Sequence, residues 1–283
     1  MYDELAPWFH LSDPAEYADE AADIVRGLAD HGVELGPANP DASVLELGSG
    51  GGNMASHLKA RAHLTLNDVA PAMLALSATL NPKCEHVEGD MRTLRLGRTF
   101  DVVLLHDAVM YMTTEADLRA AMVTAYTHLG PGGAAAFIPD FTTETYQSNT
   151  EHGGHDGPDG RSLRYREWTY DPNPLDTTIV TDYSYLLRER DGSTRVLGDR
   201  HIEGVFPRAT WLGLLADVGF RADVSVDAWE REVFVGVRRS SPSSWCNRAS
   251  SSRLIGQLAM RSAGLTSSGT GSASIRAIDS GRK

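Results

Sequence analysis

Apolar positions along the first 140 residues follow two different spacings. Five short segments are predicted to be β-strands, at residues 43–47, 63–67, 85–88, 101–105 and 134–138. Three segments between them carry apolar residues at helical spacing, at residues 53–60, 71–79 and 115–129. Continuously apolar strands that alternate with helices are typical of a parallel sheet buried on both faces. The pattern therefore predicts an α/β fold with a doubly wound, mostly parallel sheet.

Two helix boundaries are marked by particular residues. Asp13, Pro14 and Glu16 have the order of an N-cap, a first-turn proline and a capping-box glutamate, and they predict a helix before the first strand. The glycine- and proline-rich run at residues 130–133 predicts that the helix of residues 115–129 ends there.

The spacing of apolar and turn residues changes in the C-terminal half of the chain. Residues 141–206 hold strand-like segments separated by turn residues, which predicts an antiparallel β insertion. A helix at residues 209–215 and two strands at 221–226 and 230–238 follow. This final hairpin is predicted to close the sheet, which then has seven strands.

The last 44 residues are rich in serine and poor in large apolar side chains. They cannot bury enough surface to offset the entropy of ordering, so we predict that they are disordered. Three regions follow, namely a cofactor-binding core at residues 1–140 and 207–239, an insertion covering the acceptor site at 141–206 and a disordered tail at 240–283.

Composition narrows the possible partners. The formal net charge of −12 is the sum of −17 on residues 1–239 and +5 on residues 240–283, and the negative body disfavours nucleic acid as a partner. Two distant cysteines, Cys84 and Cys246, suggest neither a disulfide framework nor a metal site. No apolar run approaches the length of a membrane span, and the acidic N-terminus differs from a secretory signal. We expect a cytoplasmic protein without a membrane partner, and we leave a homodimer open.

The segment after the first predicted strand carries the strongest chemical signal. Gly48, Gly50 and Gly52 let a ligand approach the backbone, and Glu46 lies in the strand itself. Asp68 ends the next strand, where it can accept hydrogen bonds from both hydroxyls of a ribose. Together these residues predict a nucleoside ligand. Asn53 replaces the glycine of the dinucleotide fingerprint, which disfavours a nicotinamide reductase.

This pattern resembles motif I of the class I S-adenosylmethionine-dependent methyltransferases. The segments 89–92 and 96–101 resemble small-molecule enzymes of this family, particularly the deoxysugar N,N-dimethyltransferases of natural-product pathways, along which residues 1–238 can be laid. The resemblance implies a Rossmann-like fold with S-adenosylmethionine as cofactor. It further implies that Asp90 and Met91 contact the adenine, that Tyr17 approaches the methionine carboxylate, and that Tyr2 and Trp8 cover the pocket.

The end of the fourth predicted strand is the candidate reaction edge, because ligands gather at the carboxyl ends of parallel strands. His106 is our candidate for taking the acceptor's proton near its ordinary pKa of about 6.5, and it lies beside the cofactor. Tyr111 is expected to orient the acceptor and Asp107 to fix the histidine tautomer. A purely structural His106 is the alternative. The sugar enzymes carry a histidine where this chain has Tyr111 and an aromatic where it has His106.

Acceptor contacts are expected from the insertion and from the fifth strand. The candidates for substrate binding are Trp8, Asp140, Trp168, Tyr170, Tyr185 and His201, with Glu167 and Tyr183 beside them in an aromatic lid of which about half is expected to face solvent. His152 and His155 are interpreted as part of a mobile surface loop rather than as metal ligands.

The resulting hypothesis is methyl transfer from S-adenosylmethionine to a small molecule, with an amine as the expected acceptor. O- or C-methylation, with His106 or Asp107 as general base, is the alternative within enzymes. A cofactor-binding module without catalytic activity is the alternative outside them.

Overall fold

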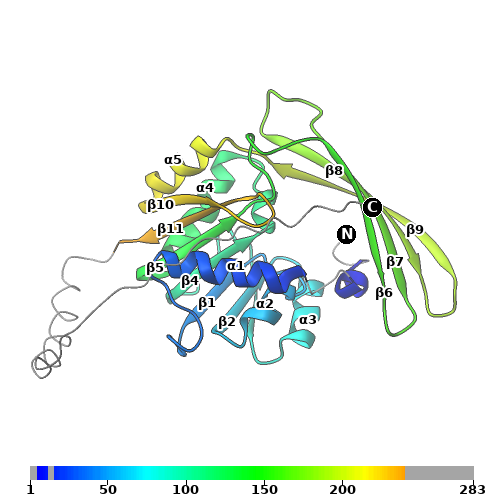
Figure 1. Ribbon diagram of the computed structural model, residues 1–283, viewed down its shortest axis with the longest axis horizontal. Coiled ribbons are helices and arrows are strands. Elements are labelled where there is room, and N and C mark those ends of the chain that lie inside the picture. The colour runs from blue at the N-terminus through cyan, green and yellow to red at the C-terminus, as the bar shows by residue number, and fades with distance from the viewer. Residues whose placement is uncertain (1–4, 12–15, 240–283) are drawn as a thin grey trace, which may run out of the picture. The chain divides into compact units, whose positions relative to one another are not determined.

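The computed structural model describes residues 5–11 and 16–239 (Figure 1). All of these described residues belong to one compact unit. The expectations for the capping residues 13–15, for Tyr2 and for the tail at 240–283 lie outside the described residues.

Seven strands form the main sheet. They are β1 (Ser43–Leu47), β2 (His63–Asp68), β3 (Glu85–Glu88), β4 (Phe100–His106), β5 (Leu129–Ile138), β10 (Phe220–Val226) and β11 (Glu232–Arg238). Their order is β10-β11-β5-β4-β1-β2-β3, and β11 runs antiparallel to both of its neighbours while the other pairs are parallel. The predicted doubly wound, mostly parallel seven-stranded sheet is confirmed.

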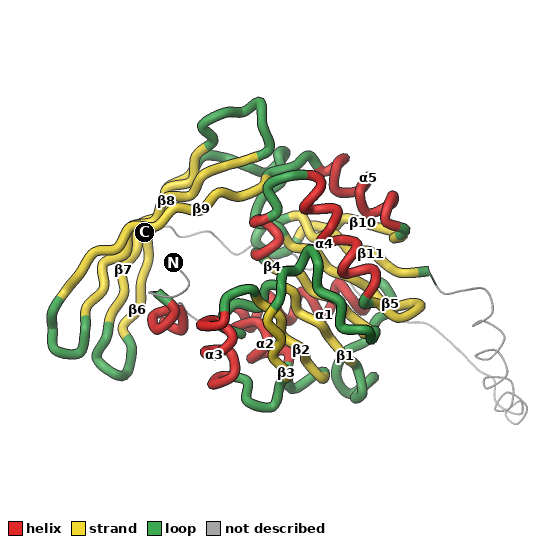
Figure 2. Tube along the Cα trace, turned by 180° about the vertical axis from the view of Figure 1, so that it is seen from behind, coloured by secondary structure: helices red, strands yellow, loops and turns green. Residues whose placement is uncertain are grey.

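Helices cover both faces of this sheet. The α-helices are α1 (Glu16–Asp30), α2 (Asn53–Leu58), α3 (Pro71–Leu80), α4 (Glu115–Thr127) and α5 (Arg208–Val218), and two 3₁₀ helices are η1 (Ala6–Leu11) and η2 (Ala108–Tyr111). Val102 and Leu104 pack with α1 and α2, whereas Val103 and Leu105 pack with α4 and α5. Figure 2, seen from behind, brings α4 and α5 to the front. Burial on both faces explains why this strand is continuously apolar.

The boundary predicted after residue 129 is wrong. Helix α4 ends at Thr127, and β5 already begins at Leu129, so the glycine-rich run lies within the strand. His128 ends the helix through its own side chain, whose Nδ1 lies 2.8 Å from the Thr124 carbonyl oxygen. A Cβ at Gly133 would lie 2.8 Å from the carbonyl oxygen of Asp101 in β4. The glycine therefore permits close approach of two strands rather than marking a turn.

A separate antiparallel sheet confirms the predicted insertion. Its strands pair in the order β6 (Asn149–Asp156), β7 (Ser162–Tyr170), β8 (Thr178–Arg188) and β9 (Thr194–Gly204). His152 and His155 belong to β6, so the mobile loop expected there is wrong. Pairing with β7 accounts for the difference, because the backbone N–H and C=O groups of β6 bond to β7 whatever side chains β6 carries. Among the described residues, no helix has the length and apolarity needed to cross a bilayer.

Candidate active site

A cavity of about 450 Å³ lies at the carboxyl end of the main sheet. Its wall is built from η1, the glycine turn after β1, the end of β4 with η2, and one face of the antiparallel sheet. The strand order reverses between β1 and β4, since β2 lies on one side of β1 and β4 on the other. Open α/β sheets bind ligands at such a switch point. The cavity therefore joins a site for a nucleoside to the inner face of the insertion.

The turn of residues 48–52, called the glycine turn here, requires glycine where its backbone packs against neighbouring side chains. Gly48 has a φ of +75°, and a Cβ there would lie 2.4 Å from the Cβ of Ala108 and 2.9 Å from the Cε of Met91. Gly52 has a φ of +79°, and its Cβ would lie 2.3 Å from the Oγ of Ser77. The backbone N–H of Gly50 donates to Asp68 Oδ2 at 2.8 Å. The second oxygen of Asp68 accepts from the Ala70 N–H at 2.8 Å, so this carboxylate is fixed beside the turn.

Glu46 is buried beneath the turn, with 4% of its surface exposed. Its Oε2 has no hydrogen-bond partner among the described residues. Burial raises its pKa to about 8, with the charge of His106 opposing this rise and the charges of Asp68 and Asp107 adding to it. A buried polar atom without a partner is costly, and a bound ligand can satisfy it.

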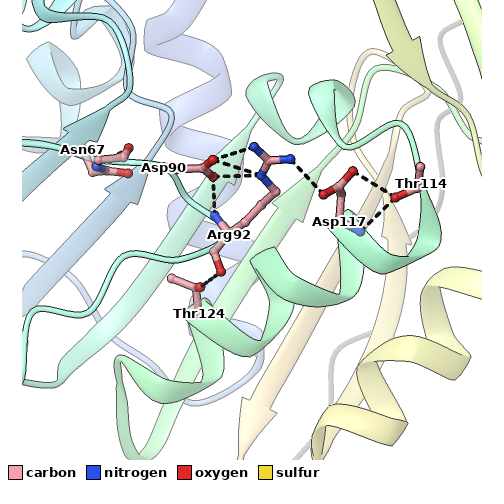
Figure 3. Close-up of polar contacts among 7 residues, drawn as sticks. Asn67, Asp90, Arg92, Thr114, Asp117 and Thr124 are labelled. Carbon is pink, nitrogen blue, oxygen red and sulfur yellow. Dashed lines mark hydrogen bonds and ion pairs between the residues drawn. The ribbon is translucent and has the colours of Figure 1, made fainter.

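Arg92 holds the carboxylate of Asp90 (Figure 3). The Nη2 of Arg92 lies 2.6 Å from Asp90 Oδ2, and its Nη1 donates to Asp117 Oδ1 at 2.9 Å. These hydrogen bonds lower the pKa of Asp90. Asn67 Nδ2 donates to the Gly89 carbonyl at 3.0 Å and so fixes the start of this loop. Nothing in the sequence predicts that Asp90, the candidate for binding the adenine, pairs with Arg92 two residues later in the chain.

The expected cofactor residues are not all on the cavity wall. The wall includes Tyr17, Glu46, Gly48, Gly50 and His106. It does not include Gly52, Asp68, Asp90 or Met91, which lie in or beside the loops that follow β1, β2 and β3. The terminal methyl group of Met91 nevertheless packs against Gly48, directly beneath that wall.

His106 lies between two carboxylates at the end of β4. Its Nε2 lies 3.0 Å from Glu20 Oε2 and its Nδ1 lies 3.2 Å from Asp107 Oδ2, with 6% of its side chain exposed. Burial lowers its pKa, but the charges of Asp107 and Glu20 outweigh burial and raise it to about 9. The expectation that His106 titrates near 6.5 is therefore wrong. At neutral pH the imidazole is a cation, so it cannot take a proton without first losing one.

Arg231 completes this charge network, and sequence reasoning missed both it and Glu20. Its Nη2 lies 3.2 Å from Glu20 Oε1, its Nε lies 2.8 Å from Asp227 Oδ2 and its Nη1 lies 3.6 Å from Asp107 Oδ1. Glu20 follows Tyr17 by one helical turn, which was the available signal for it. Arg231 lies in the β10–β11 turn, where nothing in the sequence pattern singled it out.

Asp107 has a strained backbone. Its φ of +49° lies in a region that L-residues other than glycine rarely adopt. The Asp107 N–H donates to the Ile138 carbonyl oxygen at 3.0 Å, which ties it to the end of β5. Strain of this kind persists where the surroundings fix the residue, and it is concentrated at functional sites. Asp107 and Asp140 both face the cavity from the ends of adjacent strands.

Tyr111 and His201, predicted separately, are joined by a hydrogen bond. The hydroxyl of Tyr111 lies 3.0 Å from the Nδ1 of His201, and the Nε2 of His201 lies 3.2 Å from the Oδ2 of Asp199. Tyr111 comes from η2 and the other two from β9, so the contact links the reaction edge to the insertion. Asp199 was not among the sequence candidates.

The antiparallel sheet divides the aromatic candidates between two faces. Tyr185, Tyr183, Glu167 and His201 line the cavity. Trp168 and Tyr170 are wrong as acceptor contacts, because side chains alternate along a strand and the inner positions of β7 are odd-numbered. Trp168 is 54% exposed on the outer face, where its ring centroid lies 4.6 Å from the ring centroid of Tyr170.

Two residues of the N-terminal segment reach the cavity. Trp8 is 3% exposed, lines the cavity and packs with Leu163 and Leu187 of the insertion. The ring of Tyr17 lies 6.1 Å from that of His106 in an edge-to-face arrangement. Burial, followed by the charge of Asp107, raises the pKa of the Tyr17 hydroxyl. The phenol is therefore neutral at physiological pH and acts as a hydrogen-bonding group.

Comparison with known proteins is consistent with this arrangement. Residues 44–133, from β1 into β5, match the methyltransferase domain family. A dTDP-3-amino-3,4,6-trideoxy-alpha-D-glucopyranose N,N-dimethyltransferase of Streptomyces venezuelae is 26% identical over 81% of this chain and 94% of its own length. Cypemycin N-terminal methyltransferase of a Streptomyces species is 33% identical over 44% of this chain and 56% of its own length.

Solved structures share the fold. The crystal structure of Streptomyces venezuelae DesVI covers 84% of this chain and 98% of its own, with a TM-score of 0.73 and 22% identity. The structure of SAM-bound CalS10, an amino pentose methyltransferase from Micromonospora echinaspora, covers 78% of this chain and 91% of its own, with a TM-score of 0.66 and 26% identity.

Proposed function

We propose that this chain, which is a class I S-adenosylmethionine-dependent methyltransferase, transfers the methyl group to the nitrogen of a small amine. The observation that carries the proposal is the charge of the cavity. The described residues of its wall include one positively charged side chain, His106, no lysine or arginine, and five carboxyl side chains: Glu46, Asp107, Asp140, Glu167 and Glu203. Such a wall attracts a cation and repels an acid.

The carboxyl groups on the acceptor side are crowded enough to hinder one another's ionisation. Burial raises the pKa of Asp140 well above its usual range, and the charge of Asp107 raises it further. Burial, followed by neighbouring carboxylates, also raises the pKa of Glu167, while burial and the charge of Asp107 raise that of Glu203. A bound ammonium group lowers the free-energy cost of ionising these carboxyl groups, because it pairs with their negative charges.

Aromatic rings supply the rest of the acceptor side. Tyr183 and Tyr185 stack with their ring planes 9° apart and line the cavity together with Tyr165. Tyrosine rings attract cations over their faces and cover the apolar parts of a small ligand. The acceptor is therefore an amine on a compact scaffold that rests against these rings.

The residues of the glycine turn fit S-adenosylmethionine. A Cβ at Gly48 or Gly52 would fill the cradle beside the backbone, and the buried Oε2 of Glu46 has no partner among the described residues. In our proposal Glu46, Gly48, Gly50, Gly52, Asp68, Asp90 and Met91 hold the nucleoside end, while Tyr17 and His106 face the amino-acid end. When bound, the cofactor supplies a methyl group already activated on a sulfonium.

The chain's own residues then have two tasks at the acceptor. Asp140 and Glu203 bind and orient the amine, and Trp8 with the tyrosines excludes water from it. His106 stays protonated between its two carboxylates and so neutralises part of their charge beside the cofactor. O- or C-methylation with His106 as base is less well supported, because the imidazole of His106 is already protonated at neutral pH.

Two of the known relatives suggest acceptors for a test. The Streptomyces venezuelae enzyme acts on a dTDP-linked aminosugar, and a trans-aconitate 2-methyltransferase of Klebsiella pneumoniae is 30% identical over 41% of this chain. We expect product with the dTDP-linked aminosugar or with the free aminosugar, and none with trans-aconitate, which has carboxylates and no amine to pair with the acidic wall.

Variants connect the result to the cavity. Asp140→Asn and Glu203→Gln are expected to raise the KM for the amine at least about tenfold, the cost of one charge-assisted contact. Asp182→Asn on the outer face, where Asp182 pairs with Arg200, is the matched control and is expected to leave KM unchanged. Methylation of trans-aconitate, or equal KM values in all three variants, would contradict the proposal.

A further inference from the structure

We infer that Tyr111, His201 and Asp199 form a relay that removes the proton of the acceptor nitrogen. Tyr111 is the catalytic residue that meets the amine, and His201 and Asp199 are positioning residues that act through it. The inference rests on the proposed function, because the proton that the relay takes is that of the acceptor's ammonium group.

The geometry of the relay is continuous from the cavity into the antiparallel sheet. Tyr111 is 37% exposed and lines the cavity at the reaction edge, three residues after Ala108, which contacts the cofactor turn. Its hydroxyl lies 3.0 Å from His201 Nδ1, and His201 Nε2 lies 3.2 Å from Asp199 Oδ2. The side chain of His201 is 10% exposed, so the protein rather than water sets its orientation.

Asp199 fixes the tautomer of His201. An ionised carboxylate only accepts hydrogen bonds, so the Nε2 beside it carries the hydrogen in neutral imidazole. The Nδ1 then has a free lone pair, and the hydroxyl of Tyr111 donates to it. This is the arrangement that a base needs, because the basic nitrogen is directed through the phenol toward the cavity.

Four polar groups surround the imidazole of His201. Besides Tyr111 and Asp199, the ring of Tyr183 lies 5.0 Å from that of His201, and the carboxyl of Glu203 interacts with its charge. Two carboxylates and two phenols therefore lie around the imidazole that receives the proton.

The relay acts on the acceptor in its ammonium form. The bound ammonium gives one proton to the phenol oxygen of Tyr111, and the phenol's own proton moves to His201 Nδ1. The lone pair freed on nitrogen then forms the N–CH₃ bond while the S–CH₃ electron pair stays on sulfur. An N-methylammonium, the spent cofactor, the phenol and the His201 imidazolium paired with Asp199 remain.

The relay uses His201 because His106, already a cation, cannot accept the acceptor's proton. Glu20 and Asp107 hold His106 as a cation at the end of β4, whereas the Asp199 carboxylate contacts only one nitrogen of His201 and leaves the other for Tyr111. His106 at the end of β4 thus balances charge, and His201 in β9 accepts the proton.

The tautomer is tested first, in the protein without added ligands. Two-dimensional ¹⁵N–¹H spectra of the histidine rings report which nitrogen carries the hydrogen. We expect His201 with Nε2 protonated and Nδ1 bare in the wild type, and mixed tautomers in Asp199→Ala, while Asp199→Asn restores part of the preference through its amide oxygen. A His201 with its hydrogen on Nδ1 in the wild type would overturn the relay.

Kinetics test the proton transfer, with the dTDP-linked aminosugar and the free aminosugar as acceptors. General-base catalysis is worth roughly 10²–10⁴-fold, so Tyr111→Phe and His201→Gln are expected to lower kcat at least about 100-fold at pH 7. Their deficit relative to the wild type should shrink as the pH rises to 10, because the free amine is then deprotonated by solvent. The matched controls are Tyr170→Phe and His152→Gln, both outside the cavity wall.

The outcomes separate the two proposals. A wild type that binds the cofactor but methylates no amine ends the proposed function. An active wild type whose Tyr111→Phe and His201→Gln variants keep full activity, or show a deficit of the same size at every pH, ends the relay and leaves the proposed function standing. A deficit that closes with rising pH, absent from both controls, supports the relay.

Discussion

Glu20 and His106 form a buried ion pair, with 3.0 Å between Glu20 Oε2 and His106 Nε2. Glu20 comes from α1 and His106 from the end of β4, so the pair fastens the N-terminal helix to the reaction edge. Arg231 binds the second oxygen of Glu20 at 3.2 Å. The contact therefore sets both the position of the helix that carries Tyr17 and the charge of the histidine beside the cofactor site.

Replacing Glu20 by glutamine is expected to bring the pKa of His106 down from about 9 toward its ordinary value, because burial then outweighs the remaining carboxylate. A titration of the His106 ring resonances by NMR measures this pKa. Glu115→Gln, at the first turn of α4, is a control that leaves the pKa at about 9. An unchanged His106 pKa in Glu20→Gln would show that the ion pair does not control its charge.

The same ion pair makes stability depend on pH. The folded pKa of His106 lies above the unfolded value of about 6.5, so its contribution is complete below pH 6.5 and is lost as the pH rises through about 9. The loss amounts to about 3 kcal/mol of unfolding free energy. Urea denaturation of the wild type and Glu20→Gln from pH 6 to 10 measures it, and the variant is expected to lose much less. Parallel pH profiles would contradict the account.

Glu46→Gln is expected to stabilise the folded protein at high pH and to weaken cofactor binding. The raised pKa of Glu46 means that its neutral form is favoured on folding, which helps below pH 4.5 and is lost as the pH rises through about 8. At pH 9 the glutamine variant should therefore be more stable than the wild type by roughly 1–3 kcal/mol. Calorimetry should show S-adenosylmethionine binding weakened about tenfold or more by loss of one charged contact. A variant that binds as tightly as the wild type would remove Glu46 from the site.

Gly48→Ala is expected to disrupt the cofactor turn. The φ of +75° costs an L-residue about 1–2 kcal/mol, and the overlap with Ala108 adds about 1–3 kcal/mol. Thermal unfolding and calorimetry should show a destabilised protein without measurable cofactor affinity. Gly27→Ala in α1, where a Cβ would meet nothing within 4 Å, is the control and should stabilise the helix by about 0.5–1 kcal/mol. Normal binding by Gly48→Ala would contradict the turn as cofactor site.

The two faces of the antiparallel sheet differ in function. Tyr185→Ala is expected to raise the KM for the amine by about tenfold or more, because it removes a ring from the cavity wall. Trp168→Ala removes a larger ring from the outer face and should leave KM unchanged. Steady-state kinetics on both variants, with their melting temperatures as a check on folding, decides the matter. A larger effect from Trp168→Ala would mean that acceptors bind on the other face.

The sheet could be predicted from the sequence because each core strand carries its own signal. Val102 to Leu105 are apolar without interruption, and β1, β3 and the final hairpin were placed within one or two residues. The boundary at β5 could not be predicted, because Gly133 looks like a turn residue until the Asp101 carbonyl is seen 2.8 Å from its missing Cβ. A close approach of two backbones depends on the tertiary structure, and the local sequence does not predict it.

The site was less predictable than the fold. Glycines and acids at fixed spacing predict the glycine turn that we propose as the cofactor site, since that motif is local. The His106 pKa depended on Glu20, which reaches it from another element. Trp168 and Tyr170 were chosen by residue type, but the register of β7 decides which side chains face inward. Contacts such as that of Tyr111 with His201 join residues 90 positions apart, and a single sequence gives no signal for them.

The position of the transferred methyl group tests the central claim most directly. Wild-type protein is incubated with S-adenosylmethionine labelled with ¹³C in its methyl group and with the dTDP-linked or free aminosugar, and the product is analysed by NMR. The account predicts a labelled methyl group bonded to nitrogen and formed in step with the spent cofactor. A label on oxygen or carbon, or folded protein that binds no S-adenosylmethionine, would contradict it.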